Sequence, residues 1–313
     1  MFLAHAFLVL IKVIIMKKDY LLKSITKDGL FRAYAIDATQ TVAEAAKRHQ
    51  TSNAASSAMG RAIVGGLMLS TSILEGHQAM TIKIDGKGPV GLMLIDVTAA
   101  GDVKAYLQHP KVDLPTNAAN EVDVSKAVGS HGYMQVVKNL GGKHPYTSTV
   151  HLASGEIGDD YAYYLTQSEQ IPSALDVSVL INANDTIGVA GGYLVQKMPG
   201  ATAKQINQVE KKIKSVPKLT SLLSEGYPPE KILNLIFGRK NLDYLQKMPV
   251  KFKCNCSKKR FGQDIAKLKP SQIKTMITED HGADAVCNFC GNHYHFNEDD
   301  LKALLILSQS RKR

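Results

Sequence analysis

The sequence predicts an α+β fold: an N-terminal mixed domain with a largely antiparallel sheet, a helical linker, and a small C-terminal zinc-binding domain. Three observations support this fold class. Hairpin turns outnumber strand–helix–strand units in the first 200 residues, short amphipathic segments follow, and all four cysteines lie late in the chain. With 313 residues, of which 44% are hydrophobic and 21% charged, the chain is long enough for about two packed domains.

We expect residues 16–200 to form the α+β core domain. Residues 30–36 read as a strand, and either Thr39 or Thr41 can cap a helix that follows it. Residues 53–74 are rich in Ala, Gly, Ser and Met and contain no proline, which predicts a closely packed helix.

The rest of this domain predicts strands that alternate with tight turns. Asp85-Gly86 and Gly101-Asp102 supply the positive φ angles that short hairpins need. Ser154 can cap a helix that runs to about residue 170. The predicted strands cover 80–84, 90–97, 103–108, 133–138, 146–152, 175–181 and 187–196.

Residues 201–250 predict an amphipathic helical linker. Apolar residues recur at helical spacing in two short segments that are separated by prolines and glycines: Ile206, Val209 and Ile213, then Ile232, Leu235 and Ile236. Helices of this length are marginal in isolation and need a surface for their apolar face. We therefore expect the linker to rest on the first domain.

Residues 1–15 are apolar, with Lys12 as their one formal charge. No basic segment precedes the apolar stretch and no small-residue cleavage site follows it, which argues against a signal peptide. Met16-Lys17-Lys18-Asp19 is typical of a cytosolic N-terminus. We expect residues 1–15 to be an extension outside the fold, and the protein to be cytoplasmic. Because no run reaches the roughly 18–20 apolar residues of a bilayer-spanning helix, no membrane partner is expected.

The net charge of +10 is unevenly distributed. Residues 1–200 carry 17 basic and 17 acidic residues, whereas residues 201–313 carry 21 basic and 11 acidic ones. A basic segment attracts anionic partners, so a zinc-ribbon nucleic-acid-binding protein is the alternative function. However, the chain has no Trp, and its Phe and Tyr residues are not interleaved with the basic clusters as a base-stacking platform requires. Nucleic acid is therefore not the expected partner.

The cysteines form two close pairs, which together are the candidate metal ligands: Cys254, Cys256, Cys287 and Cys290. A late cluster in a long chain is typical of metal or redox chemistry rather than of a disulfide scaffold. Two pairs joined by a loop can place four thiolates around one zinc ion and close its coordination sphere, which suits a structural or regulatory site. Three histidines are near enough in sequence to replace a thiolate: His281, His293 and His295.

The region from 251 to 313 is too small to depend on an apolar core alone. Basic residues crowd the first cysteine pair, and positive charge lowers the pKa of a thiol: Lys251, Lys253, Lys258, Lys259 and Arg260. Thiolates of low pKa are the ones oxidised to disulfides, and oxidation of metal ligands would release the metal and unfold this region. The composition permits a redox switch as well as a simple structural site.

Nothing in the sequence indicates an enzyme. No Gly-x-x-x-x-Gly-Lys-Ser/Thr loop is present, so an ATP-driven activity is not supported. Asp159 and Asp160 would point about 100° apart on a helix, which is typical of charges at a helix start rather than of an acid/base pair. A thiol oxidoreductase built on Cys287 and Cys290 would need a strand–motif–helix context that this loop does not offer.

Several motifs that occur in order indicate a family. They are Ser154-Gly155-Glu156-Ile157, Ser168-Glu169-Gln170-Ile171-Pro172-Ser173-Ala174, Ala190-Gly191-Gly192, Met198-Pro199-Gly200-Ala201, and the two cysteine pairs followed by Tyr294, Phe296 and Asp300-Leu301. With these motifs, the chain from about residue 20 to 305 resembles the redox-regulated heat-shock holdase, the thirty-three-kilodalton chaperonin of bacteria.

This resemblance implies an ATP-independent chaperone that binds unfolding or oxidatively damaged client proteins and prevents their aggregation. It implies an inactive reduced monomer with one zinc on the four cysteines, and an active homodimer formed under oxidative stress. In that form zinc has left, and the disulfides are Cys254–Cys256 and Cys287–Cys290. Short loops close at lower entropic cost, which favours the same pairs, although a shared zinc site leaves cross-pairing open.

Overall fold

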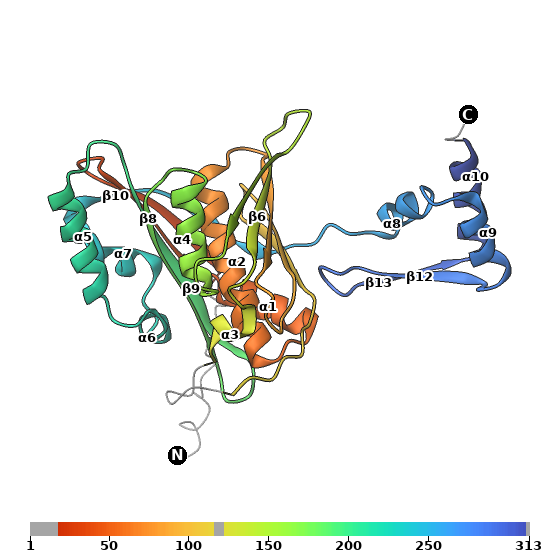
Figure 1. The fold of residues 1–313 in the computed structure, drawn as a ribbon, viewed down its shortest axis with the longest axis horizontal. Coiled ribbons are helices and arrows are strands. Elements are labelled where there is room, and N and C mark those ends of the chain that lie inside the picture. The colour runs from red at the N-terminus through yellow and green to blue at the C-terminus, as the bar shows by residue number, and fades with distance from the viewer. Residues whose placement is uncertain (1–17, 116–121, 311–313) are drawn as a thin grey trace, which may run out of the picture.

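The computed structural model describes residues 18–115 and 122–310 (Figure 1). It shows a mixed α+β protein with mainly antiparallel sheets, which confirms the predicted fold class. The expectation for residues 1–15 concerns a segment outside the described residues. None of the helices in the described ranges is long and apolar enough to cross a membrane.

The first sheet has five antiparallel strands in the order β10-β1-β2-β9-β8. Their bounds are β1 (Tyr20–Thr26), β2 (Phe31–Asp37), β8 (Ser173–Ile181), β9 (Ile187–Lys197) and β10 (Leu242–Pro249). Neither β1 nor β10 was predicted from the sequence. Strand β10 lies at the end of the segment that was expected to be purely helical, and it pairs with β1 along its length, so the chain returns to the first sheet after the helices.

The second sheet has six strands in the order β11-β5-β4-β3-β6-β7. Their bounds are β3 (Ala79–Asp85), β4 (Met93–Thr98), β5 (Asp102–Leu107), β6 (Tyr133–Asn139), β7 (Tyr146–His151) and β11 (Lys251–Phe252). The five longer strands confirm the predicted ones to within a few residues. The two-residue β11 is the parallel member of this sheet, and it occupies the outer edge of β5.

Helix α2 (Asn53–Ile73) contacts strands of both sheets, and nearly all of its residues are buried. Small residues permit this close packing: a Cβ atom on Gly65 would lie 2.4 Å from the ring of Tyr161. Helices α1 (Thr39–His49), α3 (Val124–Val128) and α4 (Ile157–Gln167) complete this part of the fold. Side chains from both sheets, α1, α2 and α4 form one large apolar core.

Both predicted helix caps were wrong. The carboxylate of Asp19, at the start of the chain, accepts hydrogen bonds from the backbone N–H groups of Gln40 and Thr41 at the start of α1. Helix α4 begins at Ile157 instead of following Ser154 directly, and Ser154 lies in the preceding turn. In each case the cap expected from the local sequence does not form. At α1 the Asp19 carboxylate accepts the hydrogen bonds instead, and at α4 the helix begins after a different turn.

Three helices cover the outer face of the first sheet: α5 (Ala203–Ser215), α6 (Leu219–Ser224) and α7 (Pro229–Phe237). With strands β1, β2 and β9 they enclose a second apolar core. In α7 the side chains of Ile232, Leu233 and Ile236 are buried in it, whereas Leu235 is 41% exposed. Helix α5 packs loosely, since it has no fully buried side chain and a cleft of about 750 Å³ lies between it, α7 and the β1–β2 turn.

The C-terminal module follows β11 and lies to one side of the two sheets (Figure 1). Its elements are α8 (Lys258–Ile265), α9 (Pro270–Thr278), β12 (Gly282–Val286), β13 (His293–Asn297) and α10 (Glu298–Ser310). Its apolar core contains three buried residues, Ile273, Phe296 and Leu301. Partly buried apolar side chains surround these three, but the core is small for a module of about 60 residues, and domains of this size commonly add a structural metal or disulfides.

Candidate metal centre

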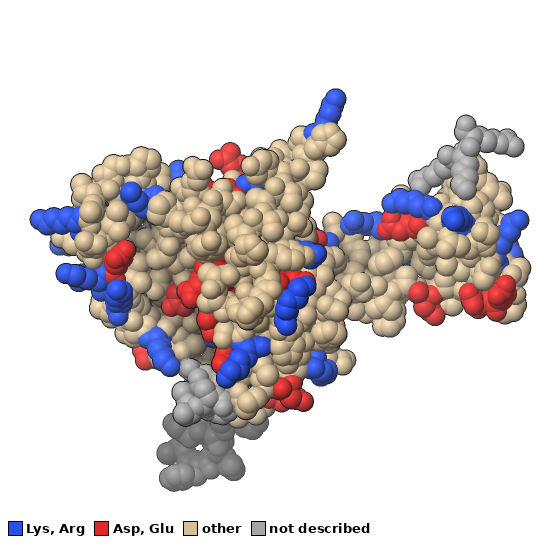
Figure 2. All heavy atoms as spheres, viewed as in Figure 1, with Lys and Arg blue, Asp and Glu red and all other residues tan. Residues whose placement is uncertain are grey.

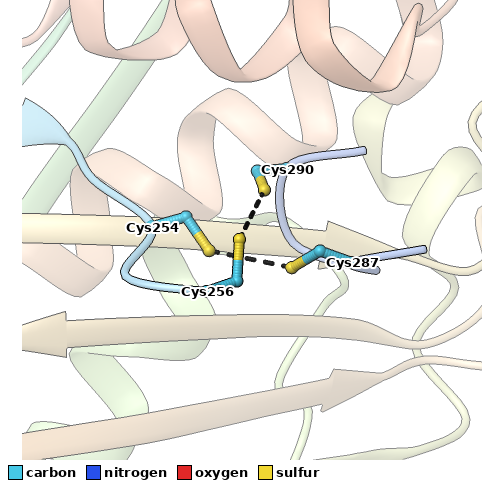
Figure 3. A group of neighbouring side chains, drawn as sticks. All are labelled: Cys254, Cys256, Cys287 and Cys290. Carbon is cyan, nitrogen blue, oxygen red and sulfur yellow. Dashed lines mark hydrogen bonds between the residues drawn. The ribbon is translucent and has the colours of Figure 1, made fainter. Parts of the chain in front are cut away.

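Two loops bring the four cysteines together (Figure 3). Cys254 and Cys256 follow β11, and Cys287 and Cys290 lie in the turn between β12 and β13. In this turn the N–H groups of Cys290 and Gly291 donate to the carbonyl of Cys287 at 3.2 and 2.8 Å, so that both sulfurs face the first pair. Gly291 has a φ of +72°, a conformation that a side chain would strain.

The four sulfurs have the geometry of a metal site. All four Sγ atoms lie within 4.8 Å of one another. The shortest separations are 3.3 Å between Cys256 and Cys290 and 3.7 Å between Cys254 and Cys287. Four sulfurs at about 2.3 Å from a central zinc are about 3.8 Å apart in a tetrahedron, so this cluster can hold such an ion with little movement. Cys287 and Cys290 are buried, and Cys254 and Cys256 are half-buried.

The three histidines are not part of this cluster. The Nδ1 atom of His281 lies 3.0 Å from Glu298, and that of His295 lies 2.9 Å from Asp284, at the surface of the module. Within residues 18–115 and 122–310, the four cysteines are the one group of potential ligands close enough to share a metal ion. The idea that a histidine replaces a thiolate is therefore not supported.

Burial and hydrogen bonding give the thiols different pKa values. Burial acts to raise the pKa of Cys256, but hydrogen bonds from the Tyr294 hydroxyl, at 3.1 Å, and from the other thiols outweigh it and lower the pKa to about 7. Burial raises the pKa of Cys254 and of Cys290. Of these three thiols, Cys256 is therefore the one most readily ionised when no metal is bound.

The lysines near the first pair are not the cause of this low pKa, contrary to the sequence-based interpretation. Lys253 forms an ion pair with Asp102 at 2.7 Å, and Lys258 forms one with Asp300 at 2.6 Å. Their charges are neutralised by carboxylates instead of stabilising a thiolate. Tyr294, one of the residues that carry the family resemblance, supplies a hydrogen bond that stabilises the Cys256 thiolate.

Replacing Tyr294 by Phe should raise the pKa of Cys256 in the zinc-free reduced protein. The change removes the hydroxyl that donates to the thiolate, and each one-unit rise in pKa would lower the thiolate fraction at pH 7 by up to about tenfold. Alkylation of Cys256 at pH 7, followed by peptide mass spectrometry, measures this fraction. Tyr146→Phe, which alters an exposed tyrosine of the core domain, should have no effect. Equal rates in wild type and Tyr294→Phe would refute the assignment.

The turn between Cys287 and Cys290 is anchored to the core domain. The Nε2 atom of His49, at the end of α1, lies 2.8 Å from the carbonyl of Ala105 and 3.1 Å from the carbonyl of Phe289. Arg48 donates to the carbonyl of Cys290 at 3.4 Å, and the ammonium of Lys104 lies 4.3 Å from the centroid of the Phe289 ring. The contacts made by Phe289 and Cys290 join segments about 180–240 residues apart, so no sequence pattern could have revealed them.

Comparisons with known proteins agree with the fold. Residues 19–297 match the family described as Hsp33 protein. A 33 kDa chaperonin of Levilactobacillus brevis is 51% identical over 94% of this chain and 99% of its own length. One from Limosilactobacillus fermentum is 52% identical over 92% of this chain and 99% of its own.

A solved structure has the same fold. The crystal structure of the 33 kDa chaperonin, Hsp33, from Thermotoga maritima aligns with a TM-score of 0.87 and 31% identity. The alignment covers 94% of this chain and 100% of that one. The match therefore includes both sheets and the cysteine module. The chain belongs to the Hsp33 family.

Proposed function

We propose that the protein is a redox-regulated, ATP-independent chaperone that holds unfolding or oxidatively damaged proteins and prevents their aggregation in the cytoplasm. The observation that carries this proposal is the position of the four-thiol cluster. It lies at the junction between a module with a small apolar core and the domain on which that module is anchored. Chemistry at the thiols therefore decides whether the module stays folded.

One zinc ion per reduced chain would be held by Cys254, Cys256, Cys287 and Cys290. When bound, zinc supplies four bonds that tie the two loops together, which a module of this size needs for stability. Peroxide can accept two electrons and two protons from a pair of thiols, forming one disulfide and two waters. A disulfide sulfur is a poor zinc ligand, so oxidation releases the metal and removes the main constraint on the module.

The apolar surface that would bind clients lies beneath the linker helices. The outer face of the first sheet carries buried side chains that α6 and α7 cover, among them Leu22, Phe31, Ala33, Tyr193 and Val195. The linker joins the module through β10 and β11, so loss of structure in the module loosens it. Uncovered, this face could bind clients and a second copy of the chain, in line with an inactive reduced monomer and an active homodimer.

An aggregation assay tests this function directly. Light scattering by a heat- or denaturant-unfolded client is followed in the presence of the reduced, zinc-loaded chain or of the same chain treated with peroxide. We expect suppression by the oxidised sample alone, without ATP. Equal scattering with the two samples would contradict redox regulation.

Each cysteine should pair with its near neighbour on oxidation, Cys254 with Cys256 and Cys287 with Cys290. In the reduced structure the closest sulfurs belong to different pairs, at 3.3 and 3.7 Å. Local unfolding after metal loss separates the two loops, however, and loop closure then favours partners two or three residues apart. Non-reducing peptide mapping decides between the pairings. A dominant Cys254–Cys287 or Cys256–Cys290 bond would show that oxidation precedes unfolding.

The alternative of a nucleic-acid-binding zinc ribbon gains no support from the charge distribution. Several lysines of the basic C-terminal third have carboxylate partners, including those that pair with Asp102, Asp264, Glu298 and Asp300. Figure 2 shows basic side chains dispersed over this face, with acidic ones among them. A binding site for nucleic acid would instead need a continuous basic stripe.

A further inference from the structure

The outer edge of strand β5 has no long neighbouring strand. A short segment and one side chain form hydrogen bonds with it instead. Alternate carbonyls, those of Gly101, Val103 and Ala105, point away from β4. They accept hydrogen bonds from Lys251 N at 3.1 Å, Lys253 N at 2.8 Å and His49 Nε2 at 2.8 Å. An open strand edge of this kind would pair with any extended chain that reached it.

These closing groups depend on the cysteine module. Residues 251–253 directly precede Cys254, and His49 Nε2 also hydrogen-bonds the carbonyl of Phe289, between Cys287 and Cys290. The ring of Phe289 also lies against Lys104 of β5. The groups that close the strand edge therefore either precede the first cysteine pair in sequence or contact the turn that holds the second pair. A change that unfolds the module removes the constraints on all of them.

Residues 251–253, which lie on this edge, indicate what kind of segment can bind there. Lys251 pairs with Asp102 and Phe252 with Val103 in parallel register. The carboxylate of Asp102 lies 2.7 Å from the ammonium of Lys253 and 3.8 Å from that of Lys251. Phe252 packs against the main core with the guanidinium of Arg48 5.4 Å from its ring centroid. The edge therefore suits an extended segment in which an apolar residue lies between two basic ones.

We propose that the outer edge of β5 is a binding site for extended client segments with an apolar residue flanked by basic residues, and that residues 251–253 occupy it as an internal ligand until the module unfolds. The proposal rests on the proposed chaperone function and adds a second surface to the face beneath the linker. Strand addition suits a chaperone with unrelated clients, because main-chain hydrogen bonds provide part of the affinity whatever the sequence, and only a short side-chain pattern adds selectivity.

A labelled peptide tests this site in the full-length chain. The probe has the sequence of residues 249–256 with Cys254→Ser and Cys256→Ser, and carries fluorescein for anisotropy. We expect it to bind the peroxide-oxidised chain and not the reduced, zinc-loaded chain. A peptide in which Asp also replaces Phe252 should not bind. In the protein, Asp102→Asn should weaken binding about two- to fivefold at low salt, the change expected for an exposed ion pair, whereas Asp243→Asn on β10 should not.

Hydrogen exchange locates the peptide. The amides of Val103 and Ala105, which face the same way as their carbonyls, should lose protection when the chain is oxidised and regain it when the peptide is added. The amides of Gly101 and Asp102 donate to Thr98 within the hairpin and should not change. A second route opens the edge without touching a cysteine: Phe252→Asp should let the reduced, zinc-loaded chain bind the peptide.

The same samples are assayed for suppression of aggregation, which separates the two proposals. If the oxidised chain suppresses aggregation but the peptide fails to bind, or binds without protecting the amides of Val103 and Ala105, the β5 site is overturned and the chaperone function stands. If the peptide binds and protects this edge but aggregation is not suppressed, the chaperone function fails, and the edge stands only as a peptide-binding site without a role in holding clients.

Discussion

Cys290→Ser should abolish tight zinc binding by the reduced protein and unfold the C-terminal module. Cys290 is buried, its sulfur lies 3.3 Å from that of Cys256, and a hydroxyl in its place leaves an open coordination position. Zinc contributes on the order of 10–16 kcal/mol to folding in small zinc modules, more than the roughly 5–9 kcal/mol expected from burying the three core side chains. No other single substitution should have a larger effect on this module.

Metal analysis after dialysis against a chelator measures the first effect, and limited proteolysis measures the second. Wild type should retain one zinc per chain and resist cleavage, whereas Cys290→Ser should retain almost none and be cut within residues 258–310. Asn288→Ser is the matched control, since Asn288 is exposed in the same turn and offers no sulfur. A Cys290→Ser protein with full, tight zinc occupancy would exclude Cys290 from the ligand set.

The parts of the fold that were predicted are those whose burial follows a local pattern. Strand β3 alternates buried and half-buried residues along its length, so Met80, Ile82 and Ile84 could be placed in the core from sequence spacing alone. Helix α2 was predicted from its small residues and its length. In both elements, each residue's local preference agrees with its final environment.

Strand β10 was missed because its sequence carries little of this pattern. Only Leu242 and Met248 are buried among its eight residues, and Leu245 is 62% exposed. Its strand conformation comes from pairing with β1, more than 200 residues away in the chain. At the edge of a sheet, main-chain hydrogen bonds can form with almost any side chains, so composition gives little indication of such a strand.

The candidate site likewise has a part that the sequence predicts and a part that it does not. The four cysteines were found because ligand spacing is a local property, encoded within each loop. The groups that couple the site to the rest of the molecule were not found, since His49 and Lys104 lie on α1 and β5 and meet Phe289 only through tertiary structure. The thiol acidities were misassigned for the same reason: proximity in sequence suggested lysines, whereas the structure places Tyr294 beside Cys256.

Leu233→Asp should activate the reduced, zinc-loaded chain without any oxidant. Leu233 is fully buried between α7 and the outer face of the first sheet, within the second apolar core. Truncating such a residue to alanine costs about 2–5 kcal/mol, and an unpaired carboxylate there costs more. Undocking the linker relieves this cost and exposes the sheet, whose own large core remains intact.

Leu235→Asp is the matched control on the same helix. Leu235 is 41% exposed, so the same change should alter stability by no more than about 0.5 kcal/mol and leave the reduced chain inactive. Suppression of client aggregation by reduced samples is the readout, and both variants should keep a full complement of zinc because neither touches the module. Hydrogen exchange across α5–α7 reports whether the linker has undocked. If Leu233→Asp undocks the linker and the reduced chain still fails to hold clients, the face beneath α6 and α7 is not the client-binding surface.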